Sequence, residues 1–430
     1  MTISRRSFIR NSSLIAGGAI VIPTLIPSCV KGANDKINLG MIGTGDHGIT
    51  WNLAAYLKLD NCRVVAACDV DSERTLKAKN LIDTHYKNQD CKTFNDFREL
   101  LNRKDIDAVQ ISTPDPWHVP LSVLAIQAGK DVCCEKPTHT IAQGRILCDV
   151  VAKHDRIYQT SLEDRSLVPY HRMTELARNG RIGKIQKIVC GLPGAYSLRY
   201  QANDFKFQAP PKGFDYDMWL GPAPEAPYCP GRCHWNFRWI FDYSGGSITD
   251  WGAHIIDTAQ RALGTEKSGP VSVEGTGVFG TEGLYNTAHT YQLTYTYENG
   301  VIMEVHSQKV EIVITGTDGW LKVNGWNGKL EASSDDILHS VIGPNEIHLS
   351  TDASEHANFL KCIKTREETY HPVEDVHRNS TIEHMGNIAM ILGRKLNWDL
   401  QKEEFINDSE ANARRSREER DPWKLKNLVV

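Results

Sequence analysis

The sequence lacks an excess of charge of either sign. It contains 49 Lys and Arg residues against 53 Asp and Glu residues, a formal net charge of -4, so no general basic field attracts nucleic acid or an anionic membrane. It also lacks compositional bias, because 40% hydrophobic and 24% charged residues are ordinary values for a globular protein and exclude disordered and fibrous classes. We therefore expect a small polar molecule, and no nucleic acid, as the partner.

Several other features are missing. No internal repeat of 20–50 residues is present, which excludes a solenoid. No uncharged run long enough to span a bilayer follows residue 29. Cys229 and Cys233 have no second cysteine pair at matching spacing, so we expect no metal site. Their loop, which includes His234, leaves open a disulfide or an ordinary turn. Most remaining cysteines lie in apolar contexts and are predicted to be core residues: Cys62, Cys68, Cys133, Cys134, Cys148 and Cys190.

Residues 1–29 have the order of an export signal. Arg5 and Arg6 precede an uncharged, glycine-containing stretch over residues 14–27 that is too short for a permanent membrane helix. This order predicts a twin-arginine signal peptide. The stretch ends at Cys29 in a sequence that resembles a lipoprotein cleavage site, which predicts a lipid anchor on that residue and a periplasmic or membrane-anchored protein. The alternative is a cytoplasmic protein with an arginine-bearing N-terminus.

Residues 36–160 alternate short β-rich runs with helical stretches. This alternation predicts a parallel, doubly wound sheet of the Rossmann type. The expected strands cover residues 37–42, 62–69, 108–112 and 131–134, and the expected helices cover residues 49–59, 72–84, 95–102, 120–129 and 141–154.

Residues 161–430 have longer alternating runs, which predict a second α/β domain with a large, open and mostly antiparallel sheet. The runs cover residues 185–191, 271–279, 289–297, 301–308 and 311–323, the last with a turn at Gly316 to Gly319. A helix is expected over residues 378–396, followed by a charged tail on the surface. An open sheet needs a cover, so we also expect a homo-oligomer.

A glycine-rich motif follows the first expected strand and precedes the first expected helix. Its glycines are Gly43, Gly45 and Gly48, in the spacing G-x-G-x-x-G with Asp46 and His47 between the last two. The glycines permit a tight turn and let the backbone approach a pyrophosphate. Asp69 ends the second strand, where a carboxylate binds ribose hydroxyls and repels a 2′-phosphate, so NAD is favoured over NADP. The alternative is a glycine turn in a sheet that binds no nucleotide.

The sequence Glu135-Lys136-Pro137, at the end of a strand, resembles the signature of the family of glucose-fructose oxidoreductase, inositol dehydrogenase and MocA-like proteins. The resemblance extends over nearly all of the chain after residue 36 and includes the segment from Ser112 to His118. It implies a Rossmann domain followed by an α/β domain whose sheet backs the substrate site. It also implies that Glu135 and Lys136 face the nicotinamide ribose, that Lys136 reaches the reacting hydroxyl, and that Thr113 and His118 contribute to the cofactor site.

A second signature of this family spans Gly245 to Asp257. Asp250 and His254 are four residues apart and would share one face of a helix, with Asp257 three residues further along. Oxidation of an alcohol needs a base for the hydroxyl proton, and histidine serves near neutral pH when a carboxylate orients it. By resemblance, His254 is the base, Asp250 controls its surroundings, and Lys136 stabilises the alkoxide. The alternative for His254 is a helix-packing role.

Aromatic residues are dense before this helix, and flat rings suit the faces of sugars. We expect Trp235, Arg238, Arg165 and Asp257 to contact the substrate. Where many relatives carry a Gln- or Arg-rich run, this chain has Glu163 and Asp164 before Arg165, two carboxylates that would alter the acid/base chemistry if they faced the pocket. Further acid/base candidates are His234, Tyr243, Glu163 and His384.

These features predict an NAD-dependent oxidoreductase that acts on a sugar, glycoside or polyol hydroxyl. Free NAD is not expected outside the cytoplasm, so an exported enzyme would hold its cofactor tightly and regenerate it in each cycle. One alternative is a redox-neutral glycosidase that oxidises C3, eliminates the C1 substituent, adds water and reduces C3 again. A second alternative is a non-catalytic surface protein that binds carbohydrate, which the presence of Lys136, Asp250 and His254 disfavours.

Overall fold

The computed structural model describes residues 36–194 and 205–429. The predicted signal peptide and lipid anchor lie outside them. The first part of the chain forms a parallel sheet in the order β3-β2-β1-β4-β5-β6, the order of a doubly wound nucleotide-binding domain. The prediction of this fold is confirmed. Its strands are β1 (Ile37–Ile42), β2 (Cys62–Cys68), β3 (Lys92–Phe94), β4 (Ala108–Ile111), β5 (Asp131–Cys134) and β6 (Tyr158–Thr160).

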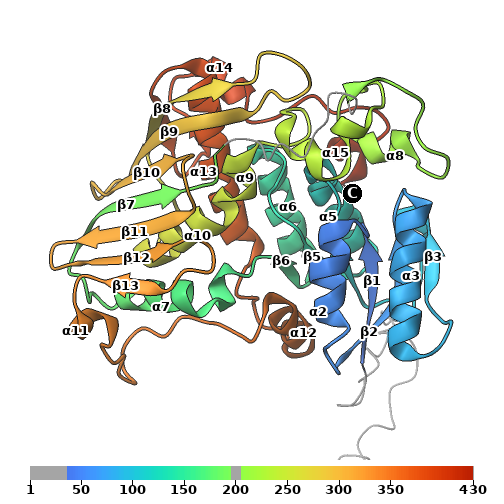
Figure 1. The fold of residues 1–430 in the computed structure, drawn as a ribbon, viewed down its shortest axis with the longest axis horizontal. Coiled ribbons are helices and arrows are strands. Elements are labelled where there is room, and N and C mark those ends of the chain that lie inside the picture. The colour runs from blue at the N-terminus through green and yellow to red at the C-terminus, as the bar shows by residue number, and fades with distance from the viewer. Residues whose placement is uncertain (1–35, 195–204, 430) are drawn as a thin grey trace, which may run out of the picture. The chain divides into compact units, whose positions relative to one another are not determined.

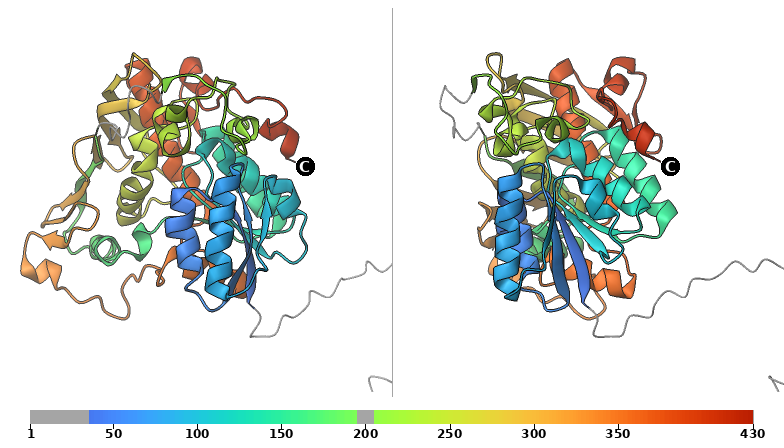
Figure 2. Two further views of the ribbon diagram at one scale, coloured as in Figure 1. Left: turned by 45° about the vertical axis from the view of Figure 1, so that its right-hand side comes forward. Right: turned by 90° about the vertical axis from the view of Figure 1, so that its right-hand side faces the viewer.

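Helices cover both faces of this sheet. Helices α2 and α3 lie on one face, and α5 and α6 lie on the other (Figure 2). The helix after the glycine loop starts with a π-helical stretch, η1, instead of regular α-helix. Helices and helical turns in this part are η1 (Gly48–Leu53), α2 (Ala54–Tyr56), α3 (Ser72–Tyr86), α4 (Phe97–Leu101), η2 (Asp115–Trp117), α5 (His118–Gln127), α6 (Ile141–His154), η3 (Asp164–Ser166) and α7 (Val168–Arg178).

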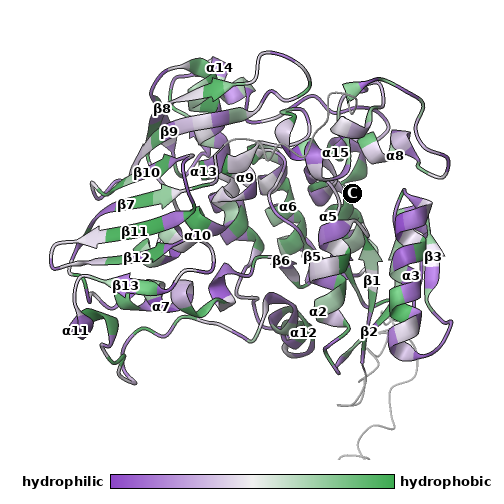
Figure 3. Ribbon diagram, viewed as in Figure 1, coloured by the Kyte–Doolittle hydropathy of each residue, from purple (hydrophilic) through white to green (hydrophobic). Residues whose placement is uncertain are grey.

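The central strands of the first sheet are buried because helices cover both of their faces. Every residue of β4 and β5 is buried, as expected for central strands of a parallel sheet. The helices that cover the sheet differ in polarity: α5 is largely hydrophobic, whereas α3 carries many hydrophilic residues (Figure 3). The six cysteines predicted to be core residues are all buried and form no disulfide, so that prediction is confirmed.

The second sheet has nine strands in the order β13-β12-β11-β7-β10-β9-β8-β14-β15. Figure 1 shows the first seven of them, from β13 to β8. Most neighbours are antiparallel, but β7 pairs with β10 in parallel, so the sheet is mixed. The predicted run over residues 311–323 forms two strands that turn at the expected glycines. The strands are β7 (Ile185–Gly191), β8 (Ser272–Phe279), β9 (Ala288–Thr296), β10 (Ile302–His306), β11 (Glu311–Gly316), β12 (Trp320–Asn324), β13 (Leu330–Ala332), β14 (Leu396–Asp399) and β15 (Glu404–Phe405).

Helices α7, α10 and α13 cover one face of this sheet. Alternate residues of β10, β11 and β12 are buried against them, while the intervening residues are partly or fully exposed. Helix α13 starts at Val373, after Pro372, five residues earlier than predicted, and ends at Leu392, before Gly393. The helices and helical turns of this part are α8 (Tyr216–Leu220), η5 (Pro230–Arg232), η6 (His234–Trp239), α9 (Ser247–Asp250), α10 (Gly252–Leu263), α11 (Asp335–Leu338), α12 (Glu355–Thr365), α13 (Val373–Leu392), α14 (Ser409–Ala413) and α15 (Leu425–Leu428).

The last part of the chain returns to the first domain. Phe359 and Leu360 of α12 lie in the core on one side of the parallel sheet, and Trp423 and Leu425 lie in the core on the other side. The prediction of a surface-lying tail is therefore wrong for these residues, because two apolar side chains among many charges anchor it. Among the helices of the described ranges, none has the length and apolarity needed to cross a bilayer.

Candidate active site

The glycine loop between β1 and η1 has the close packing that its sequence predicts. Gly43 adopts a φ of +88°, and a Cβ there would lie 2.6 Å from the backbone of Ser112. A Cβ on Gly48 would lie 2.5 Å from the carbonyl oxygen of Gly43. At Gly45, by contrast, a Cβ would meet only the Arg74 side chain, at 3.2 Å. Gly43 and Gly48 thus allow the backbone segments of the loop to pack closely, and Gly45 leaves the backbone open to the cavity.

Asp69 follows β2 and faces the same loop. Its Oδ2 accepts a hydrogen bond from the Thr44 amide at 2.6 Å, and its Oδ1 accepts one from the Asp71 amide at 3.0 Å. Burial raises the pKa of this carboxyl, and the two amides oppose the shift. This is the position at which a Rossmann domain binds the ribose of NAD. Nearby, the Thr113 hydroxyl is buried without a hydrogen-bond partner, which fits a site that a cofactor completes.

Glu135 lies between the glycine loop and the end of β5. Its Oε1 accepts a hydrogen bond from Asn52 Nδ2 at 2.8 Å and lies 3.1 Å from His47 Nε2. Burial would raise the pKa of Glu135, but His47 and Lys136 hold it below its ordinary value. Both ring nitrogens of His118 contact backbone oxygens, of Pro137 at 2.9 Å and Thr113 at 2.8 Å. His118 therefore ties together the two loops after β4 and β5.

Lys136 forms a buried ion pair with Asp250. Its Nζ donates to Asp250 Oδ1 at 2.9 Å and to the Asp250 carbonyl oxygen at 2.7 Å. Arg238 Nε donates to the same Oδ1 at 3.2 Å. Burial lowers the pKa of Lys136, but Asp250 and Glu135 reverse the shift and leave it raised. Burial likewise raises the pKa of Asp250, which the two cations bring below its ordinary value. Lys136 is thus a fixed positive charge in the cavity.

His254 lies in the first turn of α10, one helix beyond Asp250, which ends α9. Burial lowers the pKa of His254 to about 4, although Glu163 opposes the shift. Its Nδ1 is buried, 3.5 Å from Asp164 Oδ1 and 3.8 Å from Glu163 Oε2. Its ring centroid lies 4.9 Å from that of Trp326. His254 is therefore neutral at physiological pH and able to accept a proton.

One cavity of about 1530 Å³, counted out to its open mouth, joins these groups. Fourteen predicted site residues line it, namely Gly43, Gly45, Asp46, His47, Gly48, Asp69, Thr113, His118, Glu135, Lys136, Trp235, Arg238, Asp250 and His254. The glycine loop and the proposed catalytic groups thus share one space.

Arg165 and Asp257, predicted to contact substrate, do not line this cavity. They form a bidentate ion pair, with N···O distances of 2.9 and 2.6 Å, and both side chains are almost fully buried. Arg165 also pairs with Asp375 at 3.0 Å. The structure therefore places both residues behind His254, in the interior of the protein.

Several cavity residues were not predicted from the sequence. Trp326 reaches the cavity from the turn after β12, Phe214 and Trp219 from the segment around α8, and Arg74 from α3. They come from segments without a recognisable motif. The one sequence signal for a cavity residue among them was Trp326, a large aromatic residue between two glycines in a polar turn.

The other acid/base candidates separate into two groups. Glu163 and His234 line the cavity, and burial lowers the pKa of His234 to about 4. Tyr243 and His384 do not line it: the Tyr243 hydroxyl accepts a hydrogen bond from Arg232, and His384 Nε2 contacts the Thr138 carbonyl oxygen. Cys229 and Cys233 are buried and unbonded, so the loop holds no disulfide.

A doubly wound sheet with this loop, followed by a domain that supplies a buried lysine, aspartate and histidine, defines a dinucleotide-dependent oxidoreductase architecture. Two family models match the chain: the NAD-binding Rossmann fold of an oxidoreductase family over residues 37–162, and the C-terminal alpha/beta domain of the same family over residues 172–425. The chain therefore belongs to the Gfo/Idh/MocA oxidoreductase family, and its first domain is an NAD-binding domain.

Similar proteins with curated descriptions match over part of their length. A glycosyl hydrolase family 109 protein of Stenotrophomonas maltophilia is 34% identical over 141 residues, which are 31% of this chain and 29% of that protein. An inositol 2-dehydrogenase of Azotobacter vinelandii is 29% identical over 156 residues, 36% of this chain and 45% of the relative. The matches thus span about a quarter to a half of these relatives.

Solved structures share the fold over most of the chain. The aldose-aldose oxidoreductase of Caulobacter crescentus superposes with a TM-score of 0.64 at 17% identity, covering 84% of this chain and 99% of the other. A levoglucosan dehydrogenase in complex with NADH and L-sorbose gives a TM-score of 0.61 at 16% identity, covering 84% and 99%. At these identities the likeness establishes the fold.

Proposed function

We propose that the protein is an NAD-dependent oxidoreductase that acts on a hydroxyl group of a sugar, glycoside or polyol. The observation that carries the proposal is the placement of a neutral histidine, His254, and a charged lysine, Lys136, in the same cavity as the glycine loop. NAD, when bound, supplies a hydride acceptor or donor at its nicotinamide ring.

The side chains divide the remaining work. His254 takes the proton of the substrate hydroxyl, because its imidazole is neutral above a pH of about 4. The Lys136 ammonium stabilises the negative charge that develops on the same oxygen. Asp250 holds Lys136 through two hydrogen bonds. Trp235 and Trp326, which line the cavity, supply apolar faces for a sugar ring.

A second candidate function is redox-neutral cleavage of a glycoside. It is favoured by Glu163, a carboxylate in the same cavity 3.8 Å from His254 Nδ1, because elimination needs an acid or base beyond the one that serves the oxidised hydroxyl. Similarity to proteins named as glycosyl hydrolase family 109 members supports it. We rank it second because the residues that would serve the elimination, Glu163 and His234, add to an oxidoreductase site that is already complete without them.

The first experiment identifies cofactor and reaction together. Protein purified without added nucleotide is denatured, and the supernatant is analysed by mass spectrometry for NAD and NADH. The native protein is then incubated with free sugars, polyols and chromogenic glycosides. Bound NAD with a change in the NADH absorbance on adding a sugar supports the oxidoreductase. Release of the chromogenic group without net NADH supports the glycosidase, and an empty protein that still binds sugar supports a binding protein.

Two variants make this experiment specific. His254→Gln removes the proposed base, and we expect it to retain NAD while losing turnover. His348→Gln is the matched control, because His348 is an exposed histidine outside the cavity. Equal activity of His254→Gln and wild type would remove His254 from the mechanism.

We also propose export by the twin-arginine route, with a lipid anchor at Cys29 and a tightly held cofactor. The support is the order of Arg5, Arg6 and Cys29 in the sequence. Fractionation of cells that express wild type, the Arg5→Lys/Arg6→Lys variant and Cys29→Ser tests this proposal. We expect the first variant to stay in the cytoplasm and the second to leave the membrane fraction.

A homo-oligomer that covers the open face of the nine-stranded sheet is a further part of the proposal. This face carries partly exposed side chains, including Val189, Val313 and the ion pair between Lys187 and Glu304 at 2.7 Å. Light scattering at micromolar concentration measures the mass, and a monomer would contradict the proposal.

A further inference from the structure

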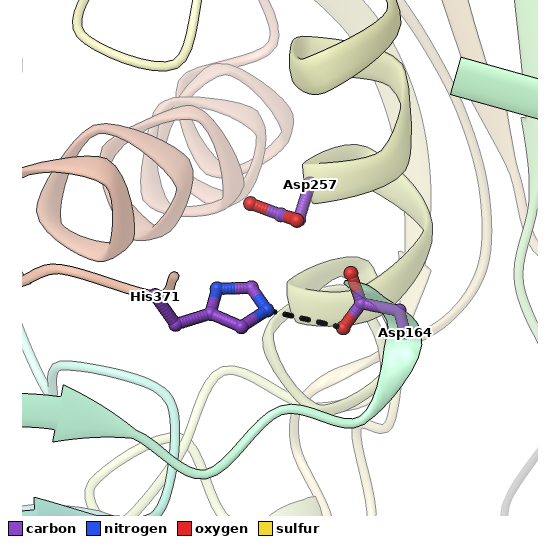
Figure 4. Close-up of side chains that lie close together, drawn as sticks. All are labelled: Asp164, Asp257 and His371. Atoms are coloured by element: carbon purple, nitrogen blue, oxygen red, sulfur yellow. Dashed lines mark ion pairs between the residues drawn. The ribbon is translucent and has the colours of Figure 1, made fainter. Parts of the chain in front are cut away.

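Behind His254, outside the cavity, lies a group of buried polar side chains that the proposed mechanism does not use. Asp164, Asp257 and His371 each place a ligand atom within 4.8 Å of the others (Figure 4). Their exposed fractions are 1%, 2% and 0%. Both oxygens of Asp164 and both ring nitrogens of His371 have no hydrogen-bond partner among the described residues. Such buried atoms are costly unless a proton or a cation satisfies them.

The two carboxyls do not have equal surroundings. Both oxygens of Asp257 accept hydrogen bonds from Arg165, at 2.9 and 2.6 Å, and Arg165 pairs with Asp375 on its other side. Although burial would raise the pKa of Asp257, Arg165 brings it below its ordinary value. Asp164 has no comparable cation, so burial and the neighbouring Asp257 raise its pKa well above the ordinary value. One proton shared between the carboxyls relieves their repulsion.

A cation in place of that proton would fit less well. It would have to bind Asp257 beside the buried guanidinium that already neutralises this carboxylate, and two buried positive charges at close range repel strongly. A proton on Asp164 adds no such repulsion. It also allows Asp164 to donate to Asp257 while its other oxygen accepts.

The accepting oxygen of Asp164 faces two imidazoles. Its Oδ1 lies 3.5 Å from His254 Nδ1 and 3.7 Å from His371 Nε2, and Figure 4 shows the His371 ring directed at Asp164. These separations exceed hydrogen-bond length by about 0.3–0.5 Å. Burial lowers the pKa of both His254 and His371, so each ring is neutral and carries one N–H that it can donate to Asp164.

We propose that Asp164 is a positioning residue that, as a neutral carboxylic acid, donates to Asp257 and accepts from His254 Nδ1–H. The proton on Nδ1 leaves Nε2 as the bare nitrogen, and because Nδ1 is buried, Nε2 is the nitrogen that a molecule in the cavity can reach. Asp164 thereby holds His254 in the tautomer that takes a proton from a hydroxyl group. This inference deepens the proposed function and rests on it for its catalytic meaning.

The charged and titratable groups around Asp164 are Glu163, Arg165, His254, Asp257, Arg261 and His371. Tyr170 and Tyr370 also face it, and both are neutral because burial raises their pKa. Within 4 Å of His254 Nδ1, the described part of the chain places one other carboxylate, that of Glu163, but it lines the cavity, where it is available to a substrate.

The test compares Asp164→Asn with Asp164→Leu. Asparagine has the donor and acceptor arrangement of a protonated aspartic acid, so Asp164→Asn should preserve both hydrogen bonds, whereas leucine has the shape without them. Asp375→Asn is the matched control, because it removes a buried carboxylate from the same Arg165 without facing His254. Protein labelled with ¹⁵N-histidine reports the tautomer by two-bond ¹⁵N–¹H correlation, and His254→Gln assigns the signal.

We expect the Nδ1–H tautomer in wild type, Asp164→Asn and Asp375→Asn, and its loss in Asp164→Leu. With an active sugar, kcat should stay within about threefold in Asp164→Asn and fall about 100-fold in Asp164→Leu, with little change in KM. An Asp164→Asn protein as impaired as the leucine variant would overturn the proposal, and so would a stoichiometric divalent metal in wild type, measured by plasma mass spectrometry. If the leucine variant does not fold, Asp164→Asn decides alone.

The tautomer is measured without substrate, so it is independent of the proposed function. Absence of sugar turnover in wild type would count against the oxidoreductase, while an Nε2–H tautomer in wild type would count against the role of Asp164.

Discussion

The protonation of His254 gives the most direct quantitative prediction. Because burial lowers its pKa to about 4 from an ordinary value of 6.5, we expect its titration midpoint near pH 4. At pH 5.5 an ordinary histidine is about 10% neutral, whereas a histidine with a pKa of about 4 is about 97% neutral. A reaction that uses His254 as base should therefore keep nearly full kcat/KM at pH 5.5 and lose it only as the pH falls through about 4.

The same shift predicts a loss of stability in acid. The unfolded chain takes up the proton from about pH 6.5 downward, while folded His254 resists it until about pH 4. Stability is thus fully present above pH 6.5 and falls as the pH drops, by about 3 kcal/mol for a shift of this size. Urea unfolding of wild type and His254→Gln between pH 7 and 4 should diverge by this amount, because other buried histidines contribute equally to both proteins.

Histidine Cε1–H correlation spectra recorded from pH 8 to pH 3.5 measure the midpoint itself, with His254→Gln providing the assignment. A midpoint near 6.5, together with parallel stability curves for the two proteins, would refute the reasoning, because it would mean that burial does not exclude the charged imidazole.

Three further predictions concern the cavity. Lys136→Met should lower kcat by about 100- to 1,000-fold while NAD stays bound, and retained turnover would contradict the charge-stabilising role. Gly48→Ala should unfold the nucleotide loop, whereas Gly45→Ala, whose new Cβ meets only a flexible side chain, should fold but bind NAD more weakly; circular dichroism and NAD content compare them. Trp326→Ala removes the ring that lies 4.9 Å from His254, so KM for an active sugar should rise roughly 5- to 30-fold, and an unchanged KM would exclude a substrate contact.

The local sequence pattern was sufficient to predict the bounds of several helices and strands. The helix over residues 141–154 and the strands over residues 37–42, 131–134 and 185–191 have the expected bounds. Their apolar periodicity is set by neighbours in the sequence. The parallel pairing of β7 with β10 depends instead on distant segments, and no local pattern determines it.

The candidate site divides in the same way. Lys136 and His254 were predicted because they lie in two segments that resemble signatures of the family, Glu135 to Pro137 and Gly245 to Asp257. Arg165 was expected in the cavity but lies behind it, since charge alone does not reveal that two buried carboxylates surround it. Trp326 was missed because its turn reaches the cavity only after the second sheet has formed.

The return of the chain to its first domain has a consequence for synthesis. Trp423 and Leu425 fill the core on one side of the parallel sheet, and Phe359 and Leu360 fill the core on the other. A ribosome that has just produced β6 has therefore released a nucleotide-binding sheet with both faces still incompletely covered. The segments that complete it follow later, α12 after most strands of the second sheet and Trp423 and Leu425 after all of them. The site for NAD therefore matures after translation of both halves and not one half at a time.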